Sequence, residues 1–315
     1  MDSTTAVRLL LRGHEPPWGL IEQTISEFWA LTARPIQQAL ERTGTPASLR
    51  GYVDLGPGTV SPAEIRLRDP YSKPAMFFEE LTRLAADGWV EAIGEMEYRV
   101  SARARTNVVE ALRSGDAYLG TLDVLPRADL ERHAALLERL THAGAIESEP
   151  RRQWASRRRV RVVGADTPVV AQIREHAMDL SARRDDAHDL AWMPLGPAGH
   201  VWNAFTLIWH GNARNAVEVA ALQSWRGYAV DDYETAIEEL GRRGWLEADA
   251  TTGHYRATAA GKALRDGVEA RTDLHFYQPW SVLSDGEWDE LSARQATLRL
   301  RLRELRRAAR GASAR

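Results

Sequence analysis

Arginine is the side chain whose spacing in this sequence most clearly suggests chemistry. Six arginines fall between residues 151 and 161, among them Arg157, Arg158 and Arg159. A run of this density suits contact with a phosphate backbone, because each neutralised phosphate adds salt-dependent affinity. The same run also fits a solvated segment that pairs with neighbouring glutamates.

No catalytic or metal-binding pattern accompanies these arginines. The nine histidines form no His-x-x-x-His or His-Glu-x-x-His pair, which would place two ligands on one helical face. The absence of cysteine excludes thiolate nucleophiles and cysteine-ligated metals. Neither a glycine-rich phosphate loop nor a nucleophile elbow occurs. We predict no catalytic residue, no metal and no cofactor, and the sequence leaves open whether the protein is an enzyme.

Tryptophan is abundant, with eleven in 315 residues. Aromatic walls with a few polar groups build apolar ligand pockets, although aromatic residues on a helix more often form ordinary core. Leu31-Thr32-Ala33-Arg34 is echoed by Leu180-Ser181-Ala182-Arg183, so an arginine recurs within apolar sequence. Each arginine should pair internally, with Glu27 or Asp186 as candidates, or face a shared cavity. The predicted ligand-binding residues are Trp29, Arg34, Arg183, Trp202, Trp209 and His210.

The elements that would position these residues are duplicated. The segment 81–92 returns as 237–248, and Tyr98-Arg99-Val100-Ser101-Ala102 returns as Tyr255-Arg256-Ala257-Thr258-Ala259. A repeat this long indicates a duplicated domain, since solenoid units reach only about 50 residues. We predict a first repeat in residues 1–150, an arginine-rich linker in 151–165 and a second repeat in 166–315.

Each repeat has the pattern helix, helix, hairpin, helix. In the second repeat an apolar helical face ends at a glycine, and Ala250-Thr251-Thr252-Gly253 suits a hairpin turn. Further helices are expected over 18–41, broken or kinked at Pro35, and over 127–141 and 285–307. The predicted fold is mainly α with short β-hairpin wings, in which two winged helix-turn-helix repeats form an intrachain pseudo-dimer.

A family resemblance supports this order of elements. Leu240-Gly241-Arg242-Arg243-Gly244-Trp245-Leu246-Glu247, with Tyr255-Arg256-Ala257-Thr258-Ala259-Ala260-Gly261 beyond it, resembles the winged helix of MarR-type proteins. The stretch 265–273 and Pro279-Trp280 are similar to an actinobacterial family of tandem MarR-like proteins, the SalK-like helix-turn-helix proteins. In the first repeat the similarity is mainly confined to 74–105. The resemblance implies two winged helices and double-stranded DNA as a partner.

Acidic residues depart from the pattern of a DNA-binding member. The expected recognition helix of the second repeat carries Asp231, Asp232 and Glu234, which would repel phosphates. That of the first repeat carries Glu79 and Glu80. The hairpin tips lack the Asp-x-Arg that MarR wings commonly present. These departures affect DNA binding and leave the fold prediction unchanged.

Composition is that of an ordinary globular protein, with 44% hydrophobic and 27% charged residues. The net charge of −3 means that any nucleic-acid contact must rest on local basic patches. No apolar run reaches 18 residues, and the N-terminus lacks the features of a signal peptide. We therefore expect no membrane span and a cytoplasmic location.

Two functions fit these observations. The first is a DNA-binding transcriptional regulator of MarR-like type that responds to a small aromatic or apolar ligand; a homodimer is also compatible. The second is a winged-helix-derived ligand-binding protein or enzyme with its site in the cleft between the repeats. For the first, the predicted DNA-binding residues are Lys73, Arg99, Arg103, Arg105, Arg226, Tyr228, Arg256, Lys262, Arg157, Arg158 and Arg159.

Overall fold

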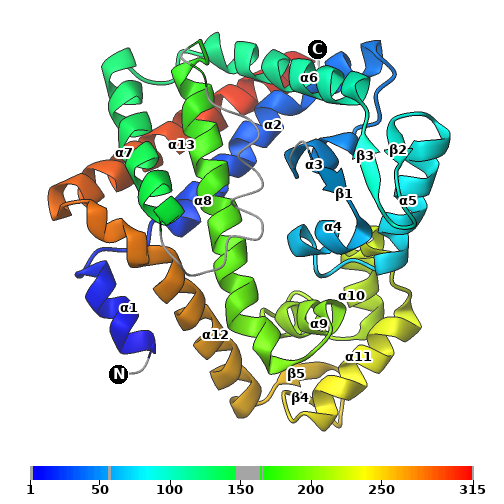
Figure 1. Ribbon diagram of the computed structural model, residues 1–315. Coiled ribbons are helices and arrows are strands. Elements are labelled where there is room, and N and C mark those ends of the chain that lie inside the picture. The colour runs from blue at the N-terminus through cyan, green and yellow to red at the C-terminus, as the bar shows by residue number, and fades with distance from the viewer. Residues whose placement is uncertain (1–2, 56–57, 147–163, 165, 314–315) are drawn as a thin grey trace. The chain divides into compact units, whose positions relative to one another are not determined.

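The computed structural model describes residues 3–55, 58–146, 164 and 166–313, and Figure 1 shows that they are mainly helical. Two compact units form, and each takes segments from both halves of the chain. Unit 1 consists of Met1–Gly58, Val100–Asp186 and Leu274–Arg315, and unit 2 of Thr59–Arg99 and Ala187–Asp273. The predicted DNA contacts of Arg157, Arg158 and Arg159 lie outside the described residues.

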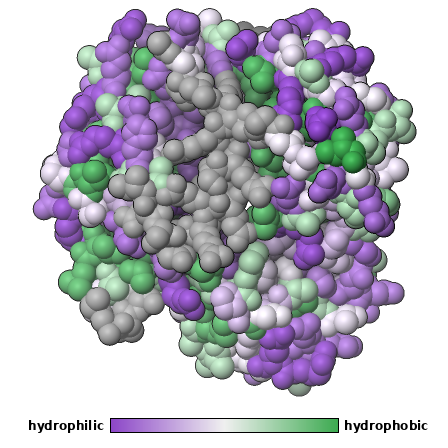
Figure 2. Space-filling view, in the orientation of Figure 1, coloured by the Kyte–Doolittle hydropathy of each residue, from purple (hydrophilic) through white to green (hydrophobic). Residues whose placement is uncertain are grey.

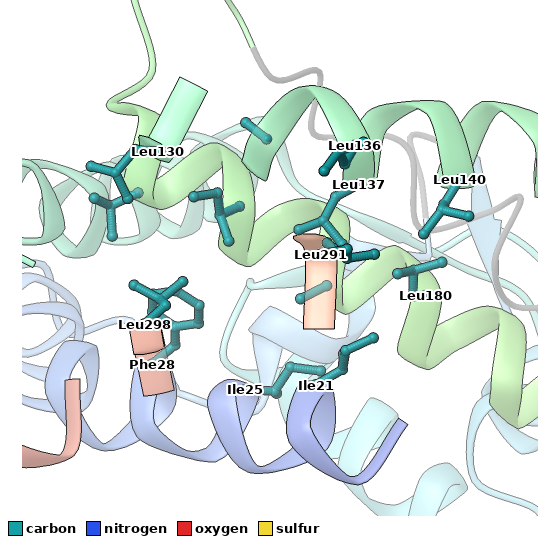
Figure 3. Packing of buried hydrophobic residues seen from close by; sticks show 14 of the residues in the cluster. Ile21, Ile25, Phe28, Leu130, Leu136, Leu137, Leu140, Leu180, Leu291 and Leu298 are labelled. Atoms are coloured by element: carbon teal, nitrogen blue, oxygen red, sulfur yellow. The ribbon is translucent and has the colours of Figure 1, made fainter. Parts of the chain in front are cut away.

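Unit 1 is built from long helices around a leucine-rich core. Its main helices are α2 (Trp18–Arg42), α6 (Ala102–Gly120), α7 (Arg127–Ile146), most of α8 (Val169–Trp192) and α13 (Asp285–Ser313). The shorter helices are α1 (Ser3–Leu11), α3 (Leu49–Asp54) and the 3₁₀ helix η4 (Gln278–Val282). Figure 3 shows side chains that several helices contribute to this core, among them Phe28, Leu137 and Leu298, which are fully buried. This burial of apolar surface is the main stabilisation of unit 1.

The helix does not break at Pro35, so of the two alternatives predicted there, a kink or a break, the break is wrong. Pro35 lies inside α2, which ends only at Arg42. The face that follows it packs against α6, where a Cβ on Gly115 would lie 2.9 Å from Cγ1 of Ile36. The close approach of the two helices holds this part of α2 in place, and such packing offsets the hydrogen bond that proline cannot donate.

Unit 2 contains short helices and both antiparallel sheets. From the first half of the chain come β1 (Thr59–Val60), α4 (Pro62–Arg68), α5 (Pro74–Ala86), β2 (Val90–Ala92) and β3 (Tyr98–Val100). From the second half come η2 (Met193–Leu195), α9 (Gly199–Trp209), α10 (Ala216–Leu222), η3 (Ser224–Arg226), α11 (Val230–Arg242), β4 (Leu246–Ala248), β5 (Tyr255–Ala257) and α12 (Ala259–Tyr277). The strand order is β1-β3-β2 in one sheet and β4-β5 in the other.

The hairpins predicted after α5 and α11 are both present, and the helix ends before them match. Gly88 and Gly244 end the helices with φ of 73° and 72°, a conformation that favours glycine. The following tryptophans, Trp89 and Trp245, each donate a backbone hydrogen bond of 2.9 Å to the leucine five residues earlier. Trp89 is buried and Trp245 is half-buried. The two halves of the chain therefore form the same local structure here.

The helices expected near the ends of the two halves are also confirmed as α7 and α13. None of the helices that the structure describes is both long and apolar enough to cross a membrane.

Candidate nucleic-acid interface

A helix-turn-helix lies in the second half of the chain. Asn215 caps α10 by accepting a 2.9 Å hydrogen bond from the Glu218 N–H. The turn runs through η3 and Gly227, whose φ is 77°, and α11 begins at Val230. The inner face of α11 carries Tyr233 and Leu240 into the core of unit 2, among the aromatic residues of α9. This packing fixes α11 and leaves its opposite face exposed.

The first half of the chain builds the matching pair, α4 and α5. Ser61 accepts from the Glu64 N–H at 3.2 Å, and the Glu64 carboxylate accepts from the Ser61 N–H at 3.1 Å. This reciprocal capping starts α4 where Asn215 starts α10. Pro74 then occupies the first position of α5, where its missing N–H costs nothing.

The exposed face of α11 is acidic. Asp231, Glu234 and Glu238 are exposed along it, at the spacing of one helical face. Unit 2 as a whole contains 13 Lys and Arg against 20 Asp and Glu, a formal charge of −7. Figure 2 shows a largely hydrophilic surface over the region of α11 and the β4–β5 hairpin. A surface of this sign repels phosphate, so any nucleic-acid contact must rest on local groups of exposed cations.

The hairpins expose two of the predicted DNA-binding arginines. Arg99 on β3 lies 3.9 Å from Glu91 on the neighbouring strand, with its side chain 56% exposed. Arg256 on β5 pairs with Glu247 at 3.0 Å, and its side chain is 71% exposed. Because exposed pairs of this kind contribute little to stability, both arginines can exchange their glutamate for a phosphate.

Three other predicted residues lie in the first turns of the helices that follow the hairpins. Arg103 is exposed and Arg105 half-buried in α6, and burial lowers the pKa of Arg105. Lys262 of α12 is exposed and pairs with Asp266 at 2.7 Å. Arg103 and Arg105 belong to unit 1, whereas Lys262 belongs to unit 2.

The remaining predicted DNA-binding residues meet where α5 and α11 begin. The Lys73 N–H donates to the Arg226 carbonyl at 2.9 Å, and Lys73 Nζ lies 3.5 Å from Oδ2 of Asp232. Lys73 Nζ also lies 5.6 Å from the ring centroid of Tyr228. The sequence predicts that these residues bind DNA, and in the structure they join the starts of the two helices.

Arg226 is the centre of this contact and is 9% exposed. Its Nη1 donates to Oδ1 of Asp69 at 2.7 Å, and its Nε donates to Gln223. The guanidinium also lies over the rings of Tyr71 and Trp225, at 5.0 and 4.0 Å. The side chain of Arg226, which the sequence predicts to bind DNA, is thus buried in contacts with the first half of the chain.

Aromatic and ionisable side chains continue behind Arg226. The rings of His200 and Tyr228 stack with centroids 4.3 Å apart, and burial lowers the pKa of His200. Burial raises the pKa of Tyr233 to about 12, so its hydroxyl stays protonated at neutral pH. The Ala229 N–H donates to Asp232 and lowers the pKa of that carboxyl.

The predicted ligand-binding residues divide between the two units. Trp29, Arg34 and Arg183 belong to unit 1, and Trp202, Trp209 and His210 to unit 2. Trp29 is half-buried beneath Arg50, at 4.5 Å from the ring centroid. Neither unit by itself assembles all six residues.

Arg34 and Arg183 do not occupy equivalent environments, which corrects the prediction from the echoed tetrapeptides. Arg34 is exposed on α2. Arg183 is buried and donates to the carbonyls of Gly144 and His275, at 2.8 and 3.2 Å. Glu27, one of the proposed acidic partners, pairs instead with Arg306.

Trp202 and Trp209 enclose a buried arginine that the sequence analysis missed. The Arg265 guanidinium lies 5.2 and 4.9 Å from their ring centroids, and it pairs with Glu269 one helical turn later. The Trp202 indole N–H donates to His188 at 3.3 Å. The sequence signal available was a charged residue between the apolar positions of α12, which does not identify its partners. His210 follows α9 and packs on Trp209.

A surface groove of about 630 Å³ lies in unit 1 between α7 and the start of α8. Its lining combines polar side chains, among them Arg127, Glu131, Asp166 and His176, with leucines, alanines and valines. None of the predicted ligand-binding residues lines it. Across the described residues no three histidine, aspartate or glutamate side chains gather as a metal site.

A helix-turn-helix family matches the chain from residue 33 to residue 308, a span that includes both pairs of helices. The protein belongs to this helix-turn-helix family. No curated protein and no solved structure matches the chain. The protein thus has a helix-turn-helix fold, and unit 2, which contains both helix-turn-helix pairs, carries an excess of negative charge.

Proposed function

We propose that this helix-turn-helix protein is a DNA-binding transcriptional regulator of MarR-like type. Its two winged helices, one from each half of the chain, act as an intrachain pseudo-dimer. The observation that carries the proposal is the recurrence of one helix-turn-helix and hairpin in both halves, with an exposed arginine on the second strand of each hairpin. Family membership supports the same conclusion.

The proposed contacts fall into two groups. Arg99 and Arg256 hold phosphates from the hairpins, because hairpin arginines are exposed and have only weak partners. Arg103 and Lys262 add phosphate contacts from the first turns of the helices that follow the two hairpins. Base-edge contacts come from the first turns of α5 and α11, as in other helix-turn-helix proteins.

Fluorescence anisotropy with labelled random-sequence duplex DNA tests the proposal. Binding should be detectable at low ionic strength and should fall linearly with log salt, with a slope that counts the neutralised phosphates. A selection of genomic fragments then gives the preferred sequence. If the purified protein binds no duplex at low salt in any conformation, the regulator function is excluded.

A second candidate function is a ligand-binding protein derived from the winged helix. The charge of −7 on unit 2 and the buried Arg265 between Trp202 and Trp209 favour it. A bound aromatic carboxylate near these rings would quench their emission. Titration of tryptophan fluorescence with a panel of aromatic carboxylates tests this, and Arg265→Lys should abolish any response because lysine cannot offer the planar guanidinium.

A further inference from the structure

The starts of the two recognition helices are too close to serve two half-sites in this conformation. Lys73, directly before α5, donates its N–H to the carbonyl of Arg226, which lies four residues before the first residue of α11. Even with a fully extended chain, the two helix starts are at most about 20 Å apart.

Successive major grooves on one face of DNA lie about 34 Å apart, and paired recognition helices must match that spacing. The N-terminal turns of recognition helices supply the base contacts. In this protein the starts of the two helices contact each other through Lys73 with Asp232, and the segments that precede them contact each other through Arg226 with Asp69. The contact therefore excludes simultaneous reading of two half-sites.

Two glycines allow the two halves of the chain to approach closely at this contact. A Cβ on Gly199, the first residue of α9, would lie 2.0 Å from the carbonyl oxygen of Pro70 and 2.7 Å from its carbonyl carbon. Only a glycine permits this approach of one backbone to another. Beside it, a Cβ on Gly227 would lie 2.2 Å from Sδ of Met76. Both glycines come from the second half of the chain, and both face the first half.

We infer that this seam between the two helix-turn-helix pairs is an autoinhibitory contact that must open before the protein reads a full site. The seam is defined by Asp69, Lys73, Gly199, Arg226 and Asp232. The inference rests on the proposed DNA-binding function and specifies how that function is regulated. The apparent affinity for DNA equals the affinity of the open form multiplied by the fraction of molecules that are open. An effector that binds only the open form raises this fraction and therefore activates the protein.

Gly199→Ala is the sharpest test, because it adds one methyl group and changes no charge. The methyl group would overlap the Pro70 backbone, which cannot move aside as a flexible side chain would. Gly267→Ala on α12 is the matched control, since a Cβ there has nothing within 4 Å. Gly199 is the first residue of α9 and Gly267 lies inside α12, so the control reports the gain in helix propensity from glycine to alanine without any steric overlap.

The conformation is measured independently of DNA. The sequence contains no cysteine, so Thr82→Cys on α5 and Thr235→Cys on α11, both at exposed positions, give specific spin-label sites. We expect a longer label-to-label distance in the Gly199→Ala background than in the Gly267→Ala background. Random-sequence duplex at low salt should bind the Gly199→Ala variant at least about tenfold more tightly, if the open state is normally a tenth or less of the population.

A reversible lock supplies the converse test. Met76→Cys with Gly227→Cys places two thiols within the contact, and their oxidation should hold the seam closed. DNA affinity should fall on oxidation and return on reduction of the same sample, which shows that the protein is still folded.

The two possible failures are distinct. If Gly199→Ala leaves both the distance and the DNA affinity equal to those of Gly267→Ala, the autoinhibitory seam is refuted while the regulator function stands. If the distance lengthens but neither the variant nor the parent binds duplex at low salt, the DNA-binding function is refuted, and with it the role of the seam.

Discussion

Asp69 and Arg226 are separated by 157 positions in the sequence, yet they form a 2.7 Å charge-assisted hydrogen bond at a partly buried position in unit 2. The Asp69 carboxylate also accepts from the Tyr71 N–H at 3.1 Å and from the Ser72 hydroxyl at 2.5 Å. One carboxylate thus shapes the turn before α5 and receives the arginine that ends η3. The turn of one helix-turn-helix is thereby fixed to the turn of the other.

Removal of this arginine should destabilise unit 2. Arg226→Ala leaves Asp69 without its guanidinium partner in a mostly buried position, and we expect a loss of about 2 kcal/mol. Arg256→Ala is the control, because its pair with Glu247 is exposed and should contribute almost nothing. Urea unfolding followed by tryptophan fluorescence measures both. An Arg226→Ala midpoint equal to that of Arg256→Ala would contradict the structural role of the pair.

The local elements around this pair could be predicted from the sequence, but the pair itself could not. Glycines at the ends of α5 and α11 and the turn at Ala250–Gly253 have local signatures, and the structure has hairpins at both places. Asp69-Pro70 is likewise a recognisable turn signal. The partner of Asp69 is set by how the segment before α5 meets η3, and no spacing in the sequence encodes that.

The echoed tetrapeptides show that matching local sequence does not predict matching side-chain environments. Arg34 and Arg183 have matching neighbours in the sequence, yet one is exposed and the other buried. The difference lies on another helix: a Cβ on Gly144 of α7 would sit 2.9 Å from Cδ of Arg183, so this glycine makes room for the arginine. Local similarity predicted the helices and not the environment of their side chains.

Charge reversal on both hairpins should weaken DNA binding without regard to sequence. Arg99→Glu combined with Arg256→Glu removes two phosphate contacts, and the slope of log affinity against log salt should flatten by about 2. Arg127→Glu on α7 makes the same type of charge change outside unit 2 and should leave the slope unchanged. The measurement is anisotropy across a salt series. An unaltered slope in the double variant would remove the hairpins from the interface.

Two helical glycines should respond with opposite signs to the same substitution. Gly115→Ala drives a methyl group to 2.9 Å from Ile36 at the α2–α6 crossing, and overpacking of this kind costs about 1–3 kcal/mol. Gly267→Ala adds a methyl group in open space on α12 and should stabilise by about 0.5–1 kcal/mol. Thermal unfolding followed by circular dichroism compares them. A stabilising Gly115→Ala would mean that the two helices are not in close contact.

Stability should fall as the pH drops through the range in which His133 titrates. His133 on α7 is fully buried and shares a 2.7 Å hydrogen bond with Gln295 on α13. Burial lowers its pKa to about 4, mainly because the interior penalises the charged ring, and nearby Arg294 adds to the effect. With its Nε2–H donated to Gln295, a further proton would have to enter at Nδ1, which is buried and has no hydrogen-bond partner within the described structure.

The direction of the change in stability with pH depends on whether the folded or the unfolded state binds more protons at His133. Between the unfolded pKa of 6.5 and the folded pKa of about 4, the unfolded chain holds more protons at this site, so acidification favours unfolding. Full stability is present above pH 6.5, and about 3 kcal/mol should be lost on acidification to pH 4. Urea unfolding across this range measures the loss. His133→Gln should remove that part of the pH dependence, whereas His142→Gln, at an exposed position on the same helix, should retain it; an identical pH dependence in the two variants would show that His133 is not the group responsible.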